Sequence, residues 1–147
     1  TDKVHEKLKG LDAHLVTSGI SQIHLPSINL ELPFKQYIML LQASSVVVLM
    51  SQIQEGWNRV AHEAILCRTP VIGSGSGGMK ELLTKSGQHI CEDWSQLGKM
   101  VLSVLQNPPE SEAGYEYAKQ FSVNQYKRSW IKLIHARYSL NAGETGK

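Results

Sequence analysis

Two glutamates, Glu55 and Glu63, lie eight positions apart in a polar stretch of the sequence. An ionised carboxylate accepts several hydrogen bonds, so Glu63 is suited to a vicinal diol such as that of a ribose. A glycine follows the first carboxylate, and Gly56 lets a ligand approach the backbone closely. A purely structural explanation is also open, because a glutamate near a helix start stabilises the helix dipole without any ligand.

The residues between these carboxylates predict the start of a helix close to Asn58. The first amides of a helix have no partner within it and carry the positive end of its dipole, which makes them an anion site. The amides concerned belong to Asn58, Arg59 and Val60. We therefore expect a diphosphate to fit at this position.

A second candidate is a glycine pattern, Gly-x-Gly-x-x-Gly, formed by Gly73, Gly75 and Gly78. After a strand and before a helix this pattern is typical of a dinucleotide site. Here it falls in the middle of the chain. A phosphate-binding loop does not fit either, because Lys80 comes one place late and Glu81 stands where Ser or Thr would hold a metal.

Both candidates need a parallel sheet to position them. Residues Ser45–Met50 are apolar without alternation, which is typical of a central strand covered on both faces. A helix over Asn58–Cys67, a strand over Pro70–Ile72 and a helix over Met79–Lys85 then complete a strand-helix-strand-helix order. Because ligands bind at the carboxyl ends of parallel strands, the loops after Met50 and Ile72 should face one site.

The rest of the chain predicts an α/β domain over residues 1–138, with a flexible tail over 139–147. Its further expected segments are a helix over Asp2–Lys9, strands over Ala13–Thr17, Gln22–Leu25 and His89–Cys91, and helices over Leu32–Ala43, Trp94–Gln106, Glu112–Phe121 and onward to about Tyr138.

Composition excludes several classes of function. The formal net charge of the 147 residues is only +2, which argues against electrostatic nucleic-acid binding, and no apolar run is long enough to cross a bilayer. Two cysteines without a pairing pattern fit a reducing, cytoplasmic compartment. The six histidines lack zinc-ligand spacing and no Asp-x-Asp pair is present, so we expect no metal site and no cofactor.

Taken together, residues 55–81 resemble the donor-binding signature of glycosyltransferase family four, the glycosyl transferases of group 1. The family pattern has Glu-Gly-Phe-Gly, a second Glu eight places on, then Gly-x-Pro-Val and a Gly-Gly-x-x-Glu turn. This sequence has Glu55-Gly-Trp-Asn, Glu63, Thr69-Pro70-Val-Ile and Gly77-Gly78-Met-Lys-Glu81. The likeness covers roughly Phe34 to Leu83 and continues more weakly to Tyr138.

The resemblance implies one half of the two-domain GT-B architecture, with a Rossmann-like parallel sheet covered by helices. It implies a retaining transferase of hexosyl type that takes a UDP- or GDP-sugar in the synthesis of a polysaccharide or glycoconjugate. Glu55 would act as the catalytic-site carboxylate on a donor-sugar hydroxyl and Glu63 would hold the ribose. Sugar and phosphate would meet Gly56, Trp57, Asn58, Arg59, Val60, Gly77 and Gly78, and the base would lie near Ser27 to Asn29.

The sequence also departs from the family pattern. Asn58 replaces a glycine, Arg68 replaces the Gly before Thr69-Pro70, and Arg59 replaces an aliphatic residue. Arg59 is then either a cationic contact to the diphosphate or a solvated side chain. The family's basic Gly-Arg and Lys-Gly segment is absent, apart from Lys9-Gly10, and so is the N-terminal acceptor domain.

We therefore expect the C-terminal, donor-binding part of a longer enzyme, inactive in sugar transfer by itself. Its partners would be a nucleotide-sugar, an unknown acceptor and an N-terminal domain of the same polypeptide, and any membrane association would belong to that missing part. Two alternatives stay open. One is a nucleotide- or dinucleotide-binding domain that uses the Gly73, Gly75 and Gly78 loop, and the other is an interaction module without donor affinity.

Overall fold

The computed structural model describes residues 6, 9, 13–19, 27–54 and 56–142, and in this part the chain forms an α/β fold with parallel strands. Strand β1 (Val16–Ser18) pairs with β2 (Ile28–Leu30). Strands β3 (Val47–Leu49), β4 (Val71–Gly73) and β5 (His89–Ile90) form a second parallel sheet in the order β3-β4-β5. The predicted α/β fold class is confirmed.

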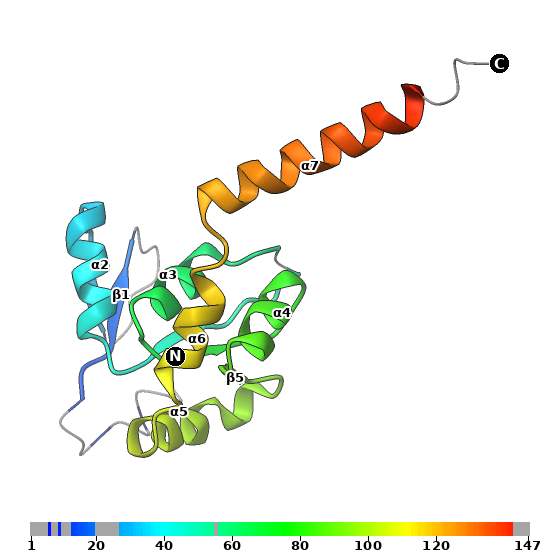
Figure 1. The fold of residues 1–147 in the computed structure, drawn as a ribbon. Coiled ribbons are helices and arrows are strands. Elements are labelled where there is room, and N and C mark those ends of the chain that lie inside the picture. The colour runs from blue at the N-terminus through cyan, green and yellow to red at the C-terminus, as the bar shows by residue number, and fades with distance from the viewer. Residues whose placement is uncertain (1–5, 7–8, 10–12, 20–26, 55, 143–147) are drawn as a thin grey trace.

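Helices connect and cover these strands (Figure 1). They are α2 (Phe34–Ala43), α3 (Arg59–Leu66), α4 (Gly78–Lys85), a short 3-10 turn η1 (Trp94–Gln96), α5 (Leu97–Gln106), α6 (Ser111–Ala118) and α7 (Val123–Ala142).

Strand β4 shows that helices cover both faces of the second sheet. Adjacent strand residues point to opposite faces. Val71 packs into a cluster with residues of α3, α4 and α6, and Ile72 packs into another cluster with residues of α5. Among the described strands β4 is thus the middle one, and all three of its residues are buried. The sequence pattern predicts that the strand within Ser45–Met50 is the central one. In the described sheet that strand, β3, is instead an edge strand: it is half-buried and pairs only with β4.

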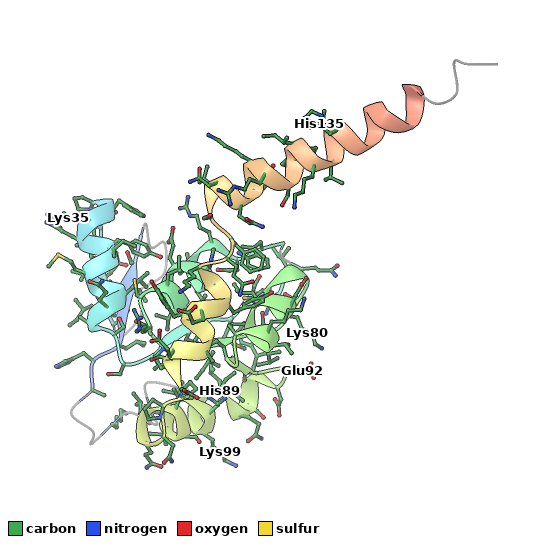
Figure 2. All side chains as sticks on the ribbon, in the orientation of Figure 1. Lys35, Lys80, His89, Glu92, Lys99 and His135 are labelled. Atoms are coloured by element: carbon green, nitrogen blue, oxygen red, sulfur yellow. The ribbon has the colours of Figure 1, made fainter. Side chains whose placement is uncertain are left out.

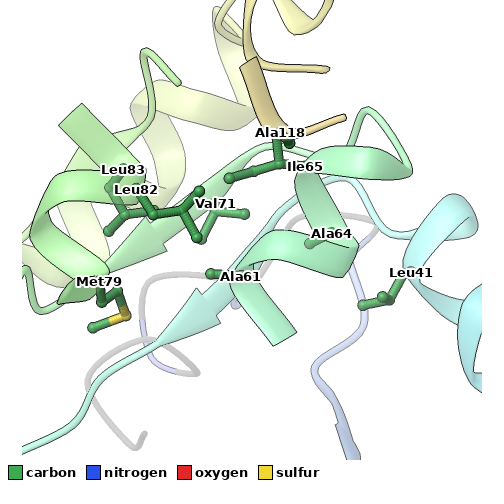
Figure 3. Close-up of a cluster of buried hydrophobic side chains, with 9 residues drawn as sticks. All are labelled: Leu41, Ala61, Ala64, Ile65, Val71, Met79, Leu82, Leu83 and Ala118. Carbon is green, nitrogen blue, oxygen red and sulfur yellow. The ribbon is translucent and has the colours of Figure 1, made fainter. Parts of the chain in front are cut away.

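The larger core cluster fixes α3 and α4 against β4 (Figure 3). Its buried members are Leu41, Ala61, Ala64, Ile65, Val71, Met79, Leu82, Leu83 and Ala118. Small alanines on α3 allow close packing of neighbouring helices, whereas the large side chains of α4 fill the space above the strand. The two helices whose first turns were predicted to bind a ligand are therefore held on one rigid base.

Most predicted elements are present with shifted ends. The first expected strand, Ala13–Thr17, is β1, and the single helix expected over Trp94–Gln106 divides into η1 and α5. The predicted helix Asp2–Lys9 and strand Gln22–Leu25 lie largely or wholly outside the described residues. The residues expected near the base, Ser27 to Asn29, overlap the start of strand β2 (Ile28–Leu30).

Helix α7 extends away from the rest of the described chain (Figure 1). It runs to Ala142, beyond the predicted end at Tyr138, so the first part of the expected tail is helical. The flexibility of 139–147 stays a prediction. The exposed apolar side chains of α7 are Val123, Tyr126, Trp130, Ile131, Leu133 and Ile134.

The geometry at the end of α3 explains why the family pattern has a glycine at the position of Arg68. The Arg68 and Thr69 amides donate to the carbonyls of Ile65 and Ala64, each at 2.9 Å, which closes the helix with a Schellman motif. That motif puts Arg68 in the left-handed region, at φ 61°. The same motif at the end of α4 uses Gly87, at φ 67°, with no such strain.

The side chain of Arg68 contacts two residues of α6, Glu112 and Tyr115. Its Nε donates to Glu112 Oε2 at 3.0 Å and its Nη2 to Oε1 at 3.3 Å, and the guanidinium lies 3.8 Å from the centre of the Tyr115 ring. The ion pair holds the pKa of the Glu112 carboxyl below its usual range. These groups are exposed, so water weakens the attraction. The contacts join α3 to α6.

We expect Arg68→Gly and Arg68→Ala to differ in stability although both remove these contacts. Alanine keeps the unfavourable left-handed backbone, which costs about 1 kcal/mol or more relative to glycine. The glycine variant should therefore have the higher free energy of unfolding by that amount, measured by urea denaturation. Equal stabilities would mean that residue 68 does not keep its left-handed conformation in solution.

Candidate functional site

The loops after β3 and β4 lie against each other at the carboxyl end of the sheet. In the parallel register Leu49 is opposite Gly73, and the Ser74 amide donates to the Leu49 carbonyl at 3.1 Å. The Ser51 amide donates to Ser74 Oγ at 3.2 Å, and Ser76 Oγ donates to the Ile53 carbonyl at 3.1 Å. The expectation that these two loops meet at one edge is confirmed.

Gly78 lies against the backbone of the loop that follows β3. A β-carbon built on Gly78 would lie 2.9 Å from the carbonyl carbon of Gly56 and 3.1 Å from the Trp57 nitrogen. Gly78 is therefore required because a peptide bond of the other loop occupies the space beside it. The positive φ at this turn belongs to Gly77 and not to Gly78: Gly77 caps α4 at φ 60° and ψ −140°.

Helix α3 starts where the sequence predicts, close to Asn58, and its first turn is capped. Asn58 is the N-cap residue, and its side-chain oxygen accepts from the Ala61 amide at 2.8 Å. The helix begins at Arg59, so the amides of Arg59 and Val60 lie in the first turn and have no carbonyl partner inside the helix. Replacing the family's glycine by asparagine thus supplies a cap and leaves these two amides for other partners.

Trp57 packs into an aromatic cluster with the end of α6. Its ring centre lies 4.6 Å from that of Phe121 and 5.7 Å from that of His62, with the His62 ring edge-on. Tyr117 adds a further edge contact to Phe121 at 5.1 Å, and His62 Nε2 is 2.8 Å from the Ala118 carbonyl oxygen. Local sequence pattern does not predict this cluster, because its members come from two distant stretches of the chain, residues 57–62 and 117–121.

Glu63 is held from two sides. The hydroxyl of Tyr37, on α2, donates to Glu63 Oε2 at 3.0 Å, and Arg59 Nε lies 3.4 Å from Oε1. The glutamate side chain is 17% exposed and the Arg59 side chain 85%. Burial and the adjacent carboxylate raise the pKa of Tyr37, so the phenol stays protonated and donates.

Sequence reasoning missed Tyr37 as a member of this site. The available signal was chemical: a half-buried phenol needs a hydrogen-bond partner for its hydroxyl. Arg59, left open between diphosphate contact and solvation, forms an exposed ion pair with Glu63 on its own helix.

Gly73 and Gly75 owe their identity to the protein interior. A β-carbon on Gly73 would lie 2.6 Å from Leu83 Cδ1, and one on Gly75 would lie 2.4 Å from Ile90 Cγ2. Lys80, considered for a phosphate loop, pairs with Glu92 at 3.2 Å on the surface (Figure 2). Packing therefore accounts for these glycines without a dinucleotide.

Two further predictions concern Glu55 and the residues expected near the base. Glu55, assigned to the donor sugar, lies outside the described residues and stays a prediction. Near the expected base site, Asn29 Oδ1 accepts from Thr17 Oγ1 at 2.9 Å, across the β1-β2 pair.

Searches for a metal centre and for a membrane span give negative results for the described residues. No three His, Cys, Asp or Glu side chains gather there as metal ligands would. None of the described helices is both long and apolar enough to cross a membrane.

We expect Gly78→Ala to lower the free energy of unfolding by about 1–3 kcal/mol, because the added methyl group forces the Gly56-Trp57 peptide away. The matched control is Gly56→Ala, where an added β-carbon meets nothing within 4 Å. The control should change stability little or raise it slightly. Urea denaturation of both variants checks this, and equal losses would contradict the close approach described above.

One solved structure is similar to this chain over almost its whole length. The crystal structure of Anabaena Alr3699/HepE in complex with UDP-glucose superposes with a TM-score of 0.66 at 18% sequence identity. The likeness covers 92% of this chain and 36% of HepE. At this identity it shows a shared fold, and the expected GT-B-type half is confirmed at that level.

No curated protein matches the chain significantly. The family model for glycosyl transferases group 1, however, matches residues 27–121. That range runs from β2 through Phe121 and includes both loops, Glu63 and the Gly77-Gly78 turn. The chain therefore belongs to the glycosyl transferases group 1 family.

Proposed function

We propose that this chain is the donor-binding domain of a retaining glycosyltransferase and binds a nucleoside diphosphate sugar. The observation that carries the proposal is the meeting of the two loops at the carboxyl end of the sheet, inside the range that the family model matches. In α/β folds this edge is where ligands bind.

The residues at this edge offer what each part of such a donor requires. The first-turn amides of Arg59 and Val60, with the Arg59 guanidinium, would neutralise part of the diphosphate charge. The backbone of Gly56, Trp57 and the Gly77-Gly78 turn would line the sugar and phosphate. Glu63, a carboxylate at the edge of the buried core, would accept from the ribose hydroxyls.

Two further assignments rest on the family resemblance. Glu55 would contact a hydroxyl of the donor sugar, and residues 27–29 would meet the base. The UDP-glucose in the HepE complex supports a uridine nucleotide and a hexose as the first donor to test. The proposal assigns no metal and no cofactor to the donor site.

The acceptor is proposed to bind outside this chain, on an N-terminal domain of the same polypeptide. The chain spans 36% of HepE, which supports a longer enzyme. A dinucleotide-binding function has less support, because interior side chains fill the space beside Gly73 and Gly75.

We expect Glu63→Ala to weaken binding of UDP by roughly tenfold to a hundredfold. A hydrogen bond to a charged group contributes about 1.5–3 kcal/mol, and water replaces it only in part. Isothermal titration calorimetry of the chain with UDP, GDP, ADP and UDP-glucose measures the affinities and identifies the base.

The control is Glu116→Ala, which removes an exposed carboxylate of α6 paired with Lys119. It should leave nucleotide affinity unchanged. A parent chain that binds no nucleoside diphosphate would contradict the proposed function. Equal losses for both variants would show that net charge, and not the position of Glu63, governs binding.

We further expect the 147-residue chain to transfer no sugar to added acceptors, even when it binds the donor. Holding donor and acceptor in reactive geometry supplies about 7–11 kcal/mol of the barrier reduction, and the proposed acceptor domain lies elsewhere. Radiolabelled donor with the chain, beside a full-length enzyme as positive control, tests this. Transfer by the chain alone would mean that it also carries the acceptor site.

A further inference from the structure

Tyr37 and Arg59 hold the Glu63 carboxylate in different ways. Tyr37 reaches it from α2 across 26 sequence positions, at 3.0 Å, with its ring packed against the larger core cluster. Arg59 reaches the other oxygen at 3.4 Å from the same helix, with a side chain that is almost fully exposed. Tyr37 is therefore the less exposed and better hydrogen-bonded of the two partners.

A glutamate side chain on a helix surface has several rotatable bonds and samples many positions. A donor fixed to a second helix restricts it to the orientation that keeps the hydrogen bond. The phenol uses one lone pair of Oε2, and a carboxylate has about four such positions. Sites on both oxygens thus remain for hydroxyl groups that arrive from the exposed side.

We propose that Tyr37 is a positioning residue, which sets the orientation of Glu63 so that its carboxylate accepts from both ribose hydroxyls of the donor nucleotide. This inference rests on the proposed function and adds to it a residue outside the loops at the sheet edge. Tyr37 itself does not touch the ribose, and its effect passes through Glu63 alone.

If Tyr37 acts through Glu63, its hydroxyl should affect the binding of nucleotides that have ribose hydroxyls and not of those that lack them. A merely structural role of Tyr37 would affect both kinds equally. Tyr37→Phe removes the hydroxyl and keeps the ring that packs on the core. Loss of a single hydrogen bond should weaken UDP binding by about three- to tenfold. Binding of 2′,3′-dideoxy-UDP, which lacks the ribose hydroxyls, should not change.

The experiment is calorimetry of both nucleotides with the parent chain, Tyr37→Phe, Glu63→Ala and the double variant. In the Glu63→Ala background, Tyr37→Phe should have no further effect on UDP affinity. Tyr126→Phe, which removes an exposed hydroxyl on α7, is the matched control and should bind both nucleotides like the parent.

Each other outcome has a distinct meaning. A parent chain that binds neither nucleotide would overturn the proposed function and this inference with it. A parent that prefers UDP while Tyr37→Phe keeps the same preference would overturn the inference alone. An equal loss for both nucleotides would also overturn it, because Tyr37 would then act on the fold and not on the carboxylate.

Discussion

The contact between Gly78 and the Gly56-Trp57 peptide is the constraint on which the site depends. Two loops that follow different strands share one space there, and a side chain at position 78 has no room. The same contact brings the first turn of α4 beside the residues that lead into α3. The ends of two helix dipoles therefore point at one edge of the sheet because a glycine permits it.

Aromatic packing also holds Trp57, the residue that follows Gly56 in this contact. Trp57 lies against Phe121 and His62, and His62 is tied to the end of α6 through the Ala118 carbonyl. Aromatic pairs with this geometry contribute about 0.5–1.5 kcal/mol beyond the area they bury. Trp57, which leads into α3, is thus tied to the residues at and after the end of α6.

The carboxylate of Glu63 illustrates a balance between burial and function. A charged group that is mostly buried needs compensating donors, and Tyr37 and Arg59 provide one on each oxygen. Arg59 stands in water, so a polyanion can compete for it at small cost. The Tyr37 bond, which is anchored in the core, is the more persistent of the two.

Local pattern was sufficient to predict the strand-helix-strand-helix unit from β3 to α4, because apolar runs and helical spacing are properties of neighbouring residues. The two loops could be placed together because parallel strands end at the same edge. The Tyr37–Glu63 bond and the Trp57 cluster could not be predicted, since each depends on the angle at which distant helices pack. Arg68 in a left-handed position needed the helix end to be known to within one residue.

Helix α7 starts at Val123, two places after Phe121, and Phe121 lies against Trp57. Phe121 therefore links the start of the long helix α7 to Trp57, the residue that leads into α3. Phe121 contacts the same residue, Trp57, whose backbone nitrogen lies beside Gly78. The paired rings of Phe121 and Trp57 thereby join the outermost helix of the described chain to the contact on which the two loops depend.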